Sequence, residues 1–177
     1  SVIVYGAGGV GLNIIQACSL KSAYPIIAID IFDNRLKVAS ELGATHIINS
    51  KKRDVNLALK KITEEGRVDI FIDNTGLSEI IEEGYKSLNS DGRLILVGVP
   101  KVGDNINIFT LPLHFGKSIV GSFGGESSPN KDIPRLINLY LKKIANFKNM
   151  ITSRFALEDI NEAIDMMREG KTAGRIM

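Results

Sequence analysis

Residues 1–20 of the chain read SVIVYGAGGVGLNIIQACSL. An apolar run leads into a glycine-rich turn and then into a helical pattern, so the stretch predicts a strand, a tight turn and a helix in immediate succession. Gly6 permits a turn that a Cβ would obstruct, Gly8 lets a diphosphate approach the backbone, and Gly11 lets the helix lie close to the strand. The free N–H groups in the first turn of such a helix, with its dipole, favour binding of an anionic pyrophosphate.

A second apolar run, residues 26–29, ends in Asp30, which lies 19 residues after Gly11. A dinucleotide-binding fold places an acid at this distance, where it accepts hydrogen bonds from the adenosine ribose. The glycine pattern alone is a weak indication, and Asp30 makes it a strong one. Asp30 could instead cap a helix or belong to a turn, but Asp33 and Asn34 are candidate caps for the next helix, which leaves Asp30 free.

Strand and helix patterns alternate along most of the chain. We expect strands at residues 1–5, 26–30, 46–49, 68–72, 93–99 and 118–123, with helices after the glycine turn and at 34–42, 55–65 and 78–88. Parallel strands need crossover connections, so this order predicts an α/β fold, a doubly wound Rossmann sheet of six parallel strands with helices on both faces. A ligand should bind at the carboxyl ends of the strands, at the switch point between the first and fourth.

The alternation stops at Pro100. Residues 100–117 show no helical period and predict a loop over the ligand edge, whereas 130–144 predict a helix that tolerates Pro134 in its first turn. Beyond it we expect a strand at 151–155, an amphipathic helix at 157–168 and a strand at 174–177. The sequence therefore suggests two parts, a nucleotide-binding domain at 1–150 and a strand–helix–strand segment at 151–177.

Composition excludes several classes of protein. The 22 basic and 20 acidic residues are scattered and leave a net charge of +2, which argues against a nucleic-acid partner. No apolar stretch reaches the ~20 residues needed to span a bilayer, so we expect no membrane partner. The lone cysteine, Cys18, forms no internal disulfide and fits a reducing cytoplasm. Because the sequence begins without methionine and inside an apolar run, we expect it to be a fragment of a longer protein.

The order of these motifs resembles the nucleotide-binding domain of the zinc-type alcohol dehydrogenases, in the medium-chain dehydrogenase/reductase superfamily. The resembling segments cover nearly the whole chain: 8–11, 27–30, 41–45, 73–76, 92–93, 97–99, 121–125, 160–163 and 170–171. The resemblance implies that the chain binds NAD(H) and is the cofactor domain of an oxidoreductase that transfers hydride between NAD(H) and an alcohol, polyol, aldehyde or ketone.

The resemblance also implies a role for individual residues. Backbone N–H groups of Gly8, Gly9 and Val10 would face the pyrophosphate, and Arg175 would also approach the pyrophosphate. Gly6 and Gly11 stand at the two ends of this glycine-rich turn. Asp30 would take both ribose hydroxyls, and Arg35 would reach that ribose. Asn74, Thr75 and Gly76 would border the adenine and its ribose. Val97, Gly98 and Val99 would lie under the nicotinamide, and Ser122, Phe123 or Gly124 would contact its carboxamide.

Other features of the family would lie outside this sequence. Its members carry an N-terminal catalytic domain whose side chains bind the active-site zinc. With one cysteine and two histidines, His46 and His114, this chain cannot form a tetrahedral zinc site of the usual kind, so we expect no catalytic residue or metal ligand here. We also expect a homodimer, because strand 118–123 is an apolar edge strand, and in the family this strand pairs with its two-fold mate.

Two other interpretations remain open. S-adenosylmethionine methyltransferases also place a glycine-rich turn after the first strand and an acid after the second, although Gly11 and the helix that begins at once argue against this class. A non-enzymatic dinucleotide-sensing module is the other, and the family-type residues between 121 and 171 disfavour it.

Overall fold

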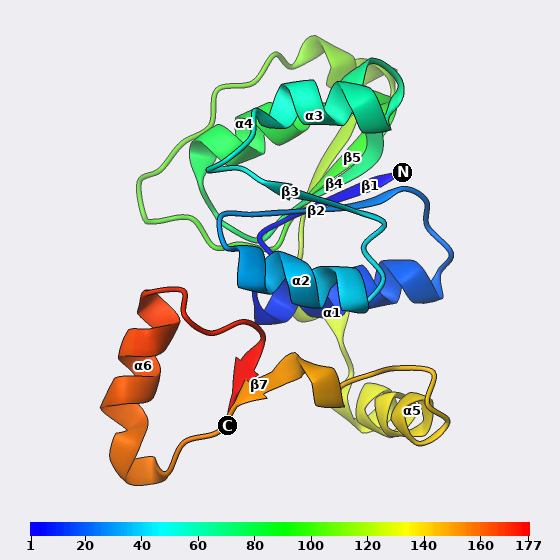
Figure 1. Ribbon diagram of the computed structural model, residues 1–177. Coiled ribbons are helices and arrows are strands. Elements are labelled where there is room, and N and C mark those ends of the chain that lie inside the picture. Colours follow the sequence, from blue (N-terminus) through cyan, green and yellow to red (C-terminus); the bar gives the residue numbers. More distant parts are fainter.

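The computed structural model describes residues 1–177 and contains a parallel sheet of six strands in the order β3-β2-β1-β4-β5-β6 (Figure 1). Its strands are β1 (Val2–Tyr5), β2 (Ile26–Asp30), β3 (His46–Asn49), β4 (Val68–Asp73), β5 (Leu88–Leu96) and β6 (Ser118–Gly121). The predicted doubly wound α/β fold is confirmed. The order reverses between β1 and β4, so the switch point lies where the sequence places it.

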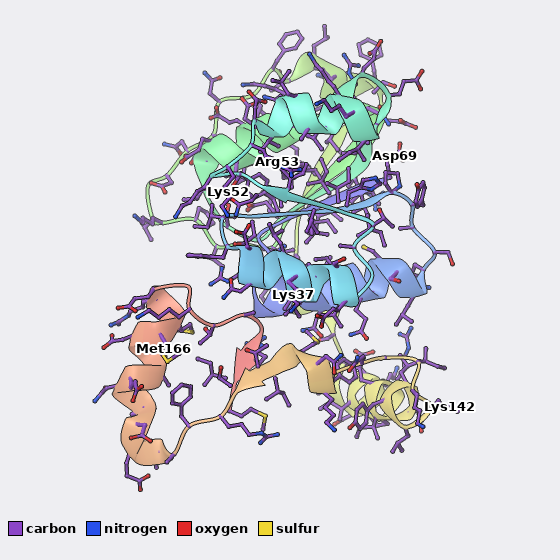
Figure 2. All side chains as sticks on the ribbon, in the orientation of Figure 1. Lys37, Lys52, Arg53, Asp69, Lys142 and Met166 are labelled. Atoms are coloured by element: carbon purple, nitrogen blue, oxygen red, sulfur yellow. The ribbon has the colours of Figure 1, made fainter.

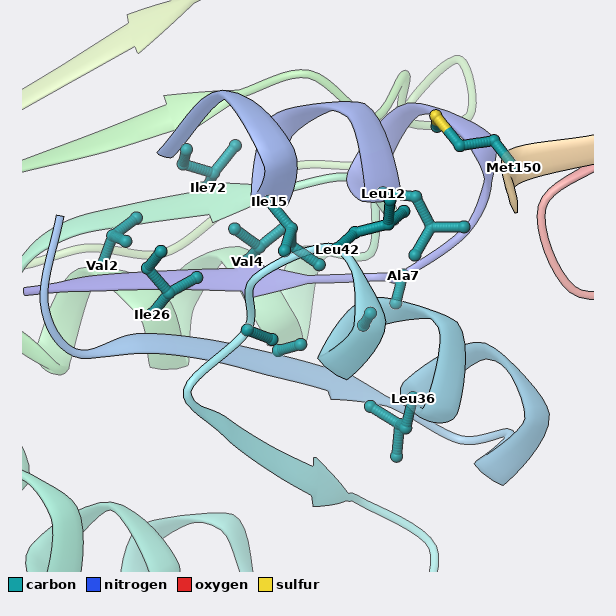
Figure 3. Packing of buried hydrophobic residues seen from close by; sticks show 13 residues of the cluster. Val2, Val4, Ala7, Leu12, Ile15, Ile26, Leu36, Leu42, Ile72 and Met150 are labelled. Carbon is teal, nitrogen blue, oxygen red and sulfur yellow. The ribbon is translucent and has the colours of Figure 1, made fainter. Parts of the chain in front are cut away.

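Helices cover both faces of this sheet (Figure 1). The four that do so are α1 (Gly9–Leu20), α2 (Asp33–Glu41), α3 (Val55–Ile62) and α4 (Ser78–Lys86). Alternate residues of β1 point to opposite faces: Val2 and Val4 belong to the cluster that packs against α1 and α2 (Figure 3), and Ile3 to the cluster beneath α3 and α4. Both faces of the central strands are therefore buried, as a continuous apolar run predicts.

Several boundaries differ from the sequence prediction. β5 begins at Leu88 instead of 93, because Leu88 already pairs with Val68. A bulge follows, and regular pairing continues from Ile70 and Arg93. It ends at Leu96, so residues 97–99 follow the strand and do not belong to it. The predicted loop at 100–117 contains a short 3-10 helix, Leu111–Phe115.

The last part of the chain lies beside the large sheet and not within it (Figure 1). It comprises α5 (Pro129–Leu141), β7 (Ile151–Ser153), α6 (Ile160–Arg168) and β8 (Arg175–Ile176), and β7 pairs with β8 in a parallel ribbon. Lys142, after α5, and Met166, on α6, lie well away from the six-stranded sheet (Figure 2). None of the helices has the length and apolar character that crossing a membrane requires.

Candidate functional site

A groove of about 420 Å³ runs along the carboxyl ends of β1, β2 and β4. It lies at the switch point of the sheet, where an open α/β fold binds its ligand. Glycines and a few polar side chains dominate the lining, which consists of Tyr5, Gly6, Gly8, Gly9, Val10, Gly11, Asp30, Ile31, Arg35, Asn74, Thr75, Leu77 and Ile80.

The glycine-rich turn is built so that α1 starts directly on β1. Gly6 has φ +94°, a conformation that side chains rarely adopt, and a Cβ at Gly11 would come within 1.9 Å of the Gly6 carbonyl oxygen. A Cβ at Gly8 would meet nothing within 4 Å, so its surface is open. Gly8 is the N-cap of α1, no side chain caps this helix, and no acidic residue lies in its first turn. No side chain within the first turn therefore compensates the positive end of the helix.

Arg175 reaches this turn from β8. Its Nε lies 2.7 Å from the position that a Cβ at Gly9 would occupy, and its Cζ lies 2.9 Å away. Gly9 therefore has to lack a side chain for the guanidinium to lie where it does. The resemblance assigned Arg175 to the pyrophosphate end of the site, and the structure places it against that turn.

Asp30 is 4% exposed and is held by two backbone donors. The N–H of Ala7 donates to its Oδ2 (2.8 Å) and the N–H of Phe32 to its Oδ1 (3.0 Å), while Arg35 Nη1 lies 3.6 Å from Oδ2. A carboxylate offers about four lone-pair sites, so two remain for a ligand. Asp30 thus joins the glycine turn to the start of α2, a role that the sequence did not reveal.

The expected helix caps are wrong. Phe32 is the N-cap residue of α2, and its helix has no side-chain cap. Asp33 accepts instead from Asn49 Nδ2 (2.6 Å) and forms an ion pair with Lys52, and Asn34 Nδ2 donates to the carbonyl of Gly170 (3.0 Å). Asp33 is held by partners on β3 and in the turn after it, whereas Asn34 Oδ1 accepts only from the adjacent Arg35 N–H (2.9 Å), so neither side chain caps α2.

The loop after β4 is organised by Asp73, which is fully buried. Its Oδ1 accepts from the N–H and the hydroxyl of Thr75 (2.9 and 2.6 Å), and its Oδ2 accepts from the N–H of Gly76 (2.9 Å). Sequence reasoning gave Asp73 no part in the site. The signal was an Asp at a strand end followed by Thr and Gly, the usual composition of a turn that an Asp side chain closes.

Asn74 carries the one buried side-chain acceptor that lacks a partner. Its Nδ2 donates to the Tyr5 carbonyl at 3.4 Å, but its Oδ1 receives no hydrogen bond. An unsatisfied buried polar atom costs about 1–3 kcal/mol, so a ligand donor at this point would stabilise the loop.

The loops after β4 and β5 meet backbone to backbone. A Cβ at Gly98 would lie 2.3 Å from the N of Gly76, and a Cβ at Gly76 (φ +70°) would lie 2.5 Å from the Val99 carbonyl oxygen. The N–H groups of Val97 and Gly98 both donate to the Asp73 carbonyl (2.9 Å each). The structure thus joins 97–99 to 74–76, although 97–99 do not line the groove.

The last predicted group, Ser122, Phe123 and Gly124, is not brought into the groove. Ser122 N–H donates to the Leu96 carbonyl (2.8 Å), which fixes the segment beside the end of β5, but Phe123 is 91% exposed and a Cβ added at Gly124 would meet no atom within 4 Å. These residues lie at the same edge of the sheet as the groove, beyond its lining.

Other reactive side chains lie apart from the groove. Burial raises the pKa of the Cys18 thiol above its ordinary value, so the thiol stays protonated and fits a packing role on α1. No three His, Cys, Asp or Glu side chains come together as a metal site.

A doubly wound sheet with a glycine turn and an acid at its switch point defines the class of Rossmann nucleotide-binding domains. Within that class, residues 9–142 match the family model described as zinc-binding dehydrogenase. The chain belongs to the zinc-binding dehydrogenase family, and this match leaves the methyltransferase interpretation without support.

Relatives of this chain are alcohol dehydrogenases. Benzyl alcohol dehydrogenase from Acinetobacter calcoaceticus is 38% identical with a TM-score of 0.89, over 97% of this chain and 47% of that one. An alcohol dehydrogenase zinc-binding domain protein from Burkholderia ambifaria is 38% identical with a TM-score of 0.88, over 97% and 46%. Alcohol dehydrogenase-like 5 of Arabidopsis thaliana is 30% identical over 97% of this chain and 45% of its own length. The chain spans about half the length of these relatives.

Proposed function

We propose that this chain is the cofactor-binding part of an oxidoreductase that transfers hydride between NAD(H) and an alcohol, polyol, aldehyde or ketone. The observation that carries the proposal is the open Gly8 surface at an uncapped helix N-terminus, in the same groove as the buried carboxylate of Asp30. The dinucleotide, when bound, accepts or donates the hydride, and the residues of this chain bind and orient it.

The pyrophosphate is held by the glycine turn in this proposal. Backbone N–H groups of Gly8, Gly9 and Val10 donate to its oxygens, and the guanidinium of Arg175 supplies a positive charge beside Gly9. Gly6 and Gly11, which also line the groove, shape the turn around the pyrophosphate.

The adenosine ribose is held by Asp30, whose two remaining acceptor positions match two hydroxyl donors. Arg35, 3.6 Å from Asp30, adds a donor at the same end of the groove. A 2′-phosphate would meet the buried negative charge of Asp30, so we propose that NAD(H) is preferred over NADP(H).

The two loops that follow β4 and β5 hold the rest of the cofactor. The unpartnered Oδ1 of Asn74 accepts a donor from the ligand, while Thr75 and Gly76 border the adenine side. Val97, Gly98 and Val99 form the surface under the nicotinamide. The backbone of Ser122, Phe123 or Gly124 meets the carboxamide, which requires the segment after β6 to move toward the groove.

No three His, Cys, Asp or Glu side chains of this chain come together as a candidate metal site. We propose that zinc and the substrate bind in a catalytic domain outside residues 1–177, and that 151–177 pack against that domain. Two apolar surfaces support this. A hollow of about 560 Å³ lies against Ile133, Leu136, Ile137 and Tyr140 of α5, and another of about 290 Å³, along α6, has nine hydrophobic lining residues and no other kind.

We also propose that two copies pair through β6. This strand is the outermost of the sheet, so one row of its backbone groups is unpaired, and Val120 is 41% exposed. Antiparallel pairing with a second β6 would continue the sheet across both subunits.

Titration with NADH and with S-adenosylmethionine tests the cofactor assignment. We expect NADH to bind, with a change in nicotinamide fluorescence, and S-adenosylmethionine not to bind. Arg175→Gln should weaken NADH several-fold, and the control Arg168→Gln, an exposed arginine paired with Asp165, should not. Binding of S-adenosylmethionine in place of NADH would overturn the proposal.

An activity assay tests the division of labour between this chain and the rest of the enzyme. The chain by itself should show no alcohol oxidation with NAD and no stoichiometric zinc by metal analysis. Turnover that depends on a metal bound within residues 1–177 would contradict the proposal.

A further inference from the structure

The aromatic ring of Phe32, two residues after Asp30, has two positive charges close to it. Arg35 Cζ lies 4.7 Å from the ring centroid, and Lys51 Nζ lies 5.3 Å from it. A cation at such distances from an aromatic ring is attracted by the negative face of the ring, which favours positions of a flexible lysine side chain close to it. One ring therefore positions two cations that come from different elements, α2 and the turn after β3.

Phe32 is itself fixed in position. Its N–H donates to Asp30 Oδ1 (3.0 Å), which ties the ring to the carboxylate of the ribose site. The tip of its ring packs against Gly170, where an added Cβ would come within 2.1 Å of Phe32 Cζ. Asn34 fastens the same contact by donating to the Gly170 carbonyl (3.0 Å). The ring thus fills the space between the ribose site and the segment after α6.

The turn that carries Lys51 is also held beside Asp30. Ser50 N–H donates to the Asp30 carbonyl (3.1 Å), and Lys51 N–H donates to Asn49 Oδ1 (3.0 Å). The neighbouring Lys52, labelled in Figure 2, differs from Lys51 in that it forms an ion pair with Asp33. Of the two adjacent lysines, only Lys51 is turned to the Phe32 ring, and it has no carboxylate partner within 4 Å.

We propose that Lys51 is a further determinant of cofactor specificity: with Arg35 on the Phe32 ring, it places a second cation at the adenosine ribose and so moderates the rejection of a 2′-phosphate by Asp30. This inference rests on the proposed binding of a nicotinamide dinucleotide. The local charges are one carboxylate, Asp30, against two cations, whereas Asp33 and Lys52 neutralise each other. The chain should therefore prefer NADH and still bind NADPH measurably.

The test compares dissociation constants for NADH and NADPH, measured by nicotinamide fluorescence, in matched lysine variants. Lys51→Gln should weaken NADPH by about threefold or more and change NADH less than twofold, because the 2′-phosphate is the nearest added charge. Lys52→Gln removes the same charge one residue away and should leave the NADPH to NADH ratio unchanged. Raising the salt concentration should weaken NADPH more in the unaltered chain than in Lys51→Gln.

Variants of the ring separate positioning from general electrostatics. Phe32→Leu keeps an apolar side chain without an aromatic face and should reproduce the loss of NADPH affinity, whereas Phe32→Tyr keeps the face and should retain it. If Lys51→Gln and Lys52→Gln shift the ratio equally, or neither shifts it, the inference is wrong even though NADH binds. If the unaltered chain binds neither dinucleotide, the proposed function itself fails.

Discussion

Replacing Asp30 by serine tests the centre of the proposed site. The carboxylate accepts from the N–H groups of Ala7 and Phe32, which leaves two acceptor positions for ribose hydroxyls. Charge-assisted hydrogen bonds contribute ~1.5–3 kcal/mol each, and ~1.4 kcal/mol is a factor of ten in affinity. Loss of one such bond, with serine replacing the other in part, should weaken NADH about tenfold or more. NADPH should bind more tightly, because Arg35 and Lys51 then face the 2′-phosphate without an opposing carboxylate.

The same substitution should also affect folding. It leaves one or both of the Ala7 and Phe32 N–H groups without an acceptor, which costs about 1–3 kcal/mol in buried surroundings, so urea unfolding should show a loss of this size. The matched control is Asp165→Ser, which removes an exposed ion pair with Arg168 on α6, outside the groove, and should leave both stability and cofactor affinity nearly unchanged. If Asp30→Ser lost stability but bound NADH within twofold of the unaltered chain, Asp30 would be a structural residue only, and the ribose assignment would be refuted.

Three further predictions follow from glycine packing, the sheet edge and thiol burial. Gly11→Ala should cost at least about 2 kcal/mol in urea unfolding because its Cβ would overlap the Gly6 carbonyl, whereas Gly8→Ala should stay within about 1 kcal/mol of the unaltered chain and yet weaken NADH. Val120→Pro should turn the expected dimer into a monomer in light scattering, and an unaltered chain that is monomeric well above micromolar concentration would contradict the pairing of β6. Cys18 should react slowly with a thiol reagent at pH 8 in the folded chain and quickly in urea, because burial raises its pKa and the thiolate is the reactive form.

The sequence was most informative where the signals are local. Strand and helix periods, the three glycines of the first turn and the acid at the end of β2 depend on neighbouring residues, and they predicted the sheet, its switch point and the glycines and carboxylate that line the groove. The extended start of β5 was missed because Leu88 pairs with Val68 across a bulge, which no local pattern encodes. Pairing between distant segments decides such boundaries, and local propensity does not.

The polar contacts of the site were less predictable for the same reason. Asp33 and Asn34 are good caps by composition, but Asp33 pairs with Lys52 and Asn49, and Asn34 spans between the Arg35 N–H and the Gly170 carbonyl. Only the fold brings the partners of Asp33 and the Gly170 carbonyl to these side chains. The contacts of the Phe32 ring with Arg35 and Lys51 could not be predicted from the sequence, because the two cations come from separate elements.

The contact between Arg175 and Gly9 joins positions that are 166 residues apart in the sequence. All six strands of the large sheet precede β7 and β8 in the chain, and N-terminal units fold first during synthesis, so the sheet can form before β8 is made. The glycine-rich turn would then form early, and the Arg175 guanidinium would contact it only after β7 and β8 had paired. If Arg175 holds the pyrophosphate as proposed, full affinity for the cofactor would therefore appear later than the folded sheet. Proteolytic removal of β8 would then leave the sheet folded but lower its affinity for the dinucleotide.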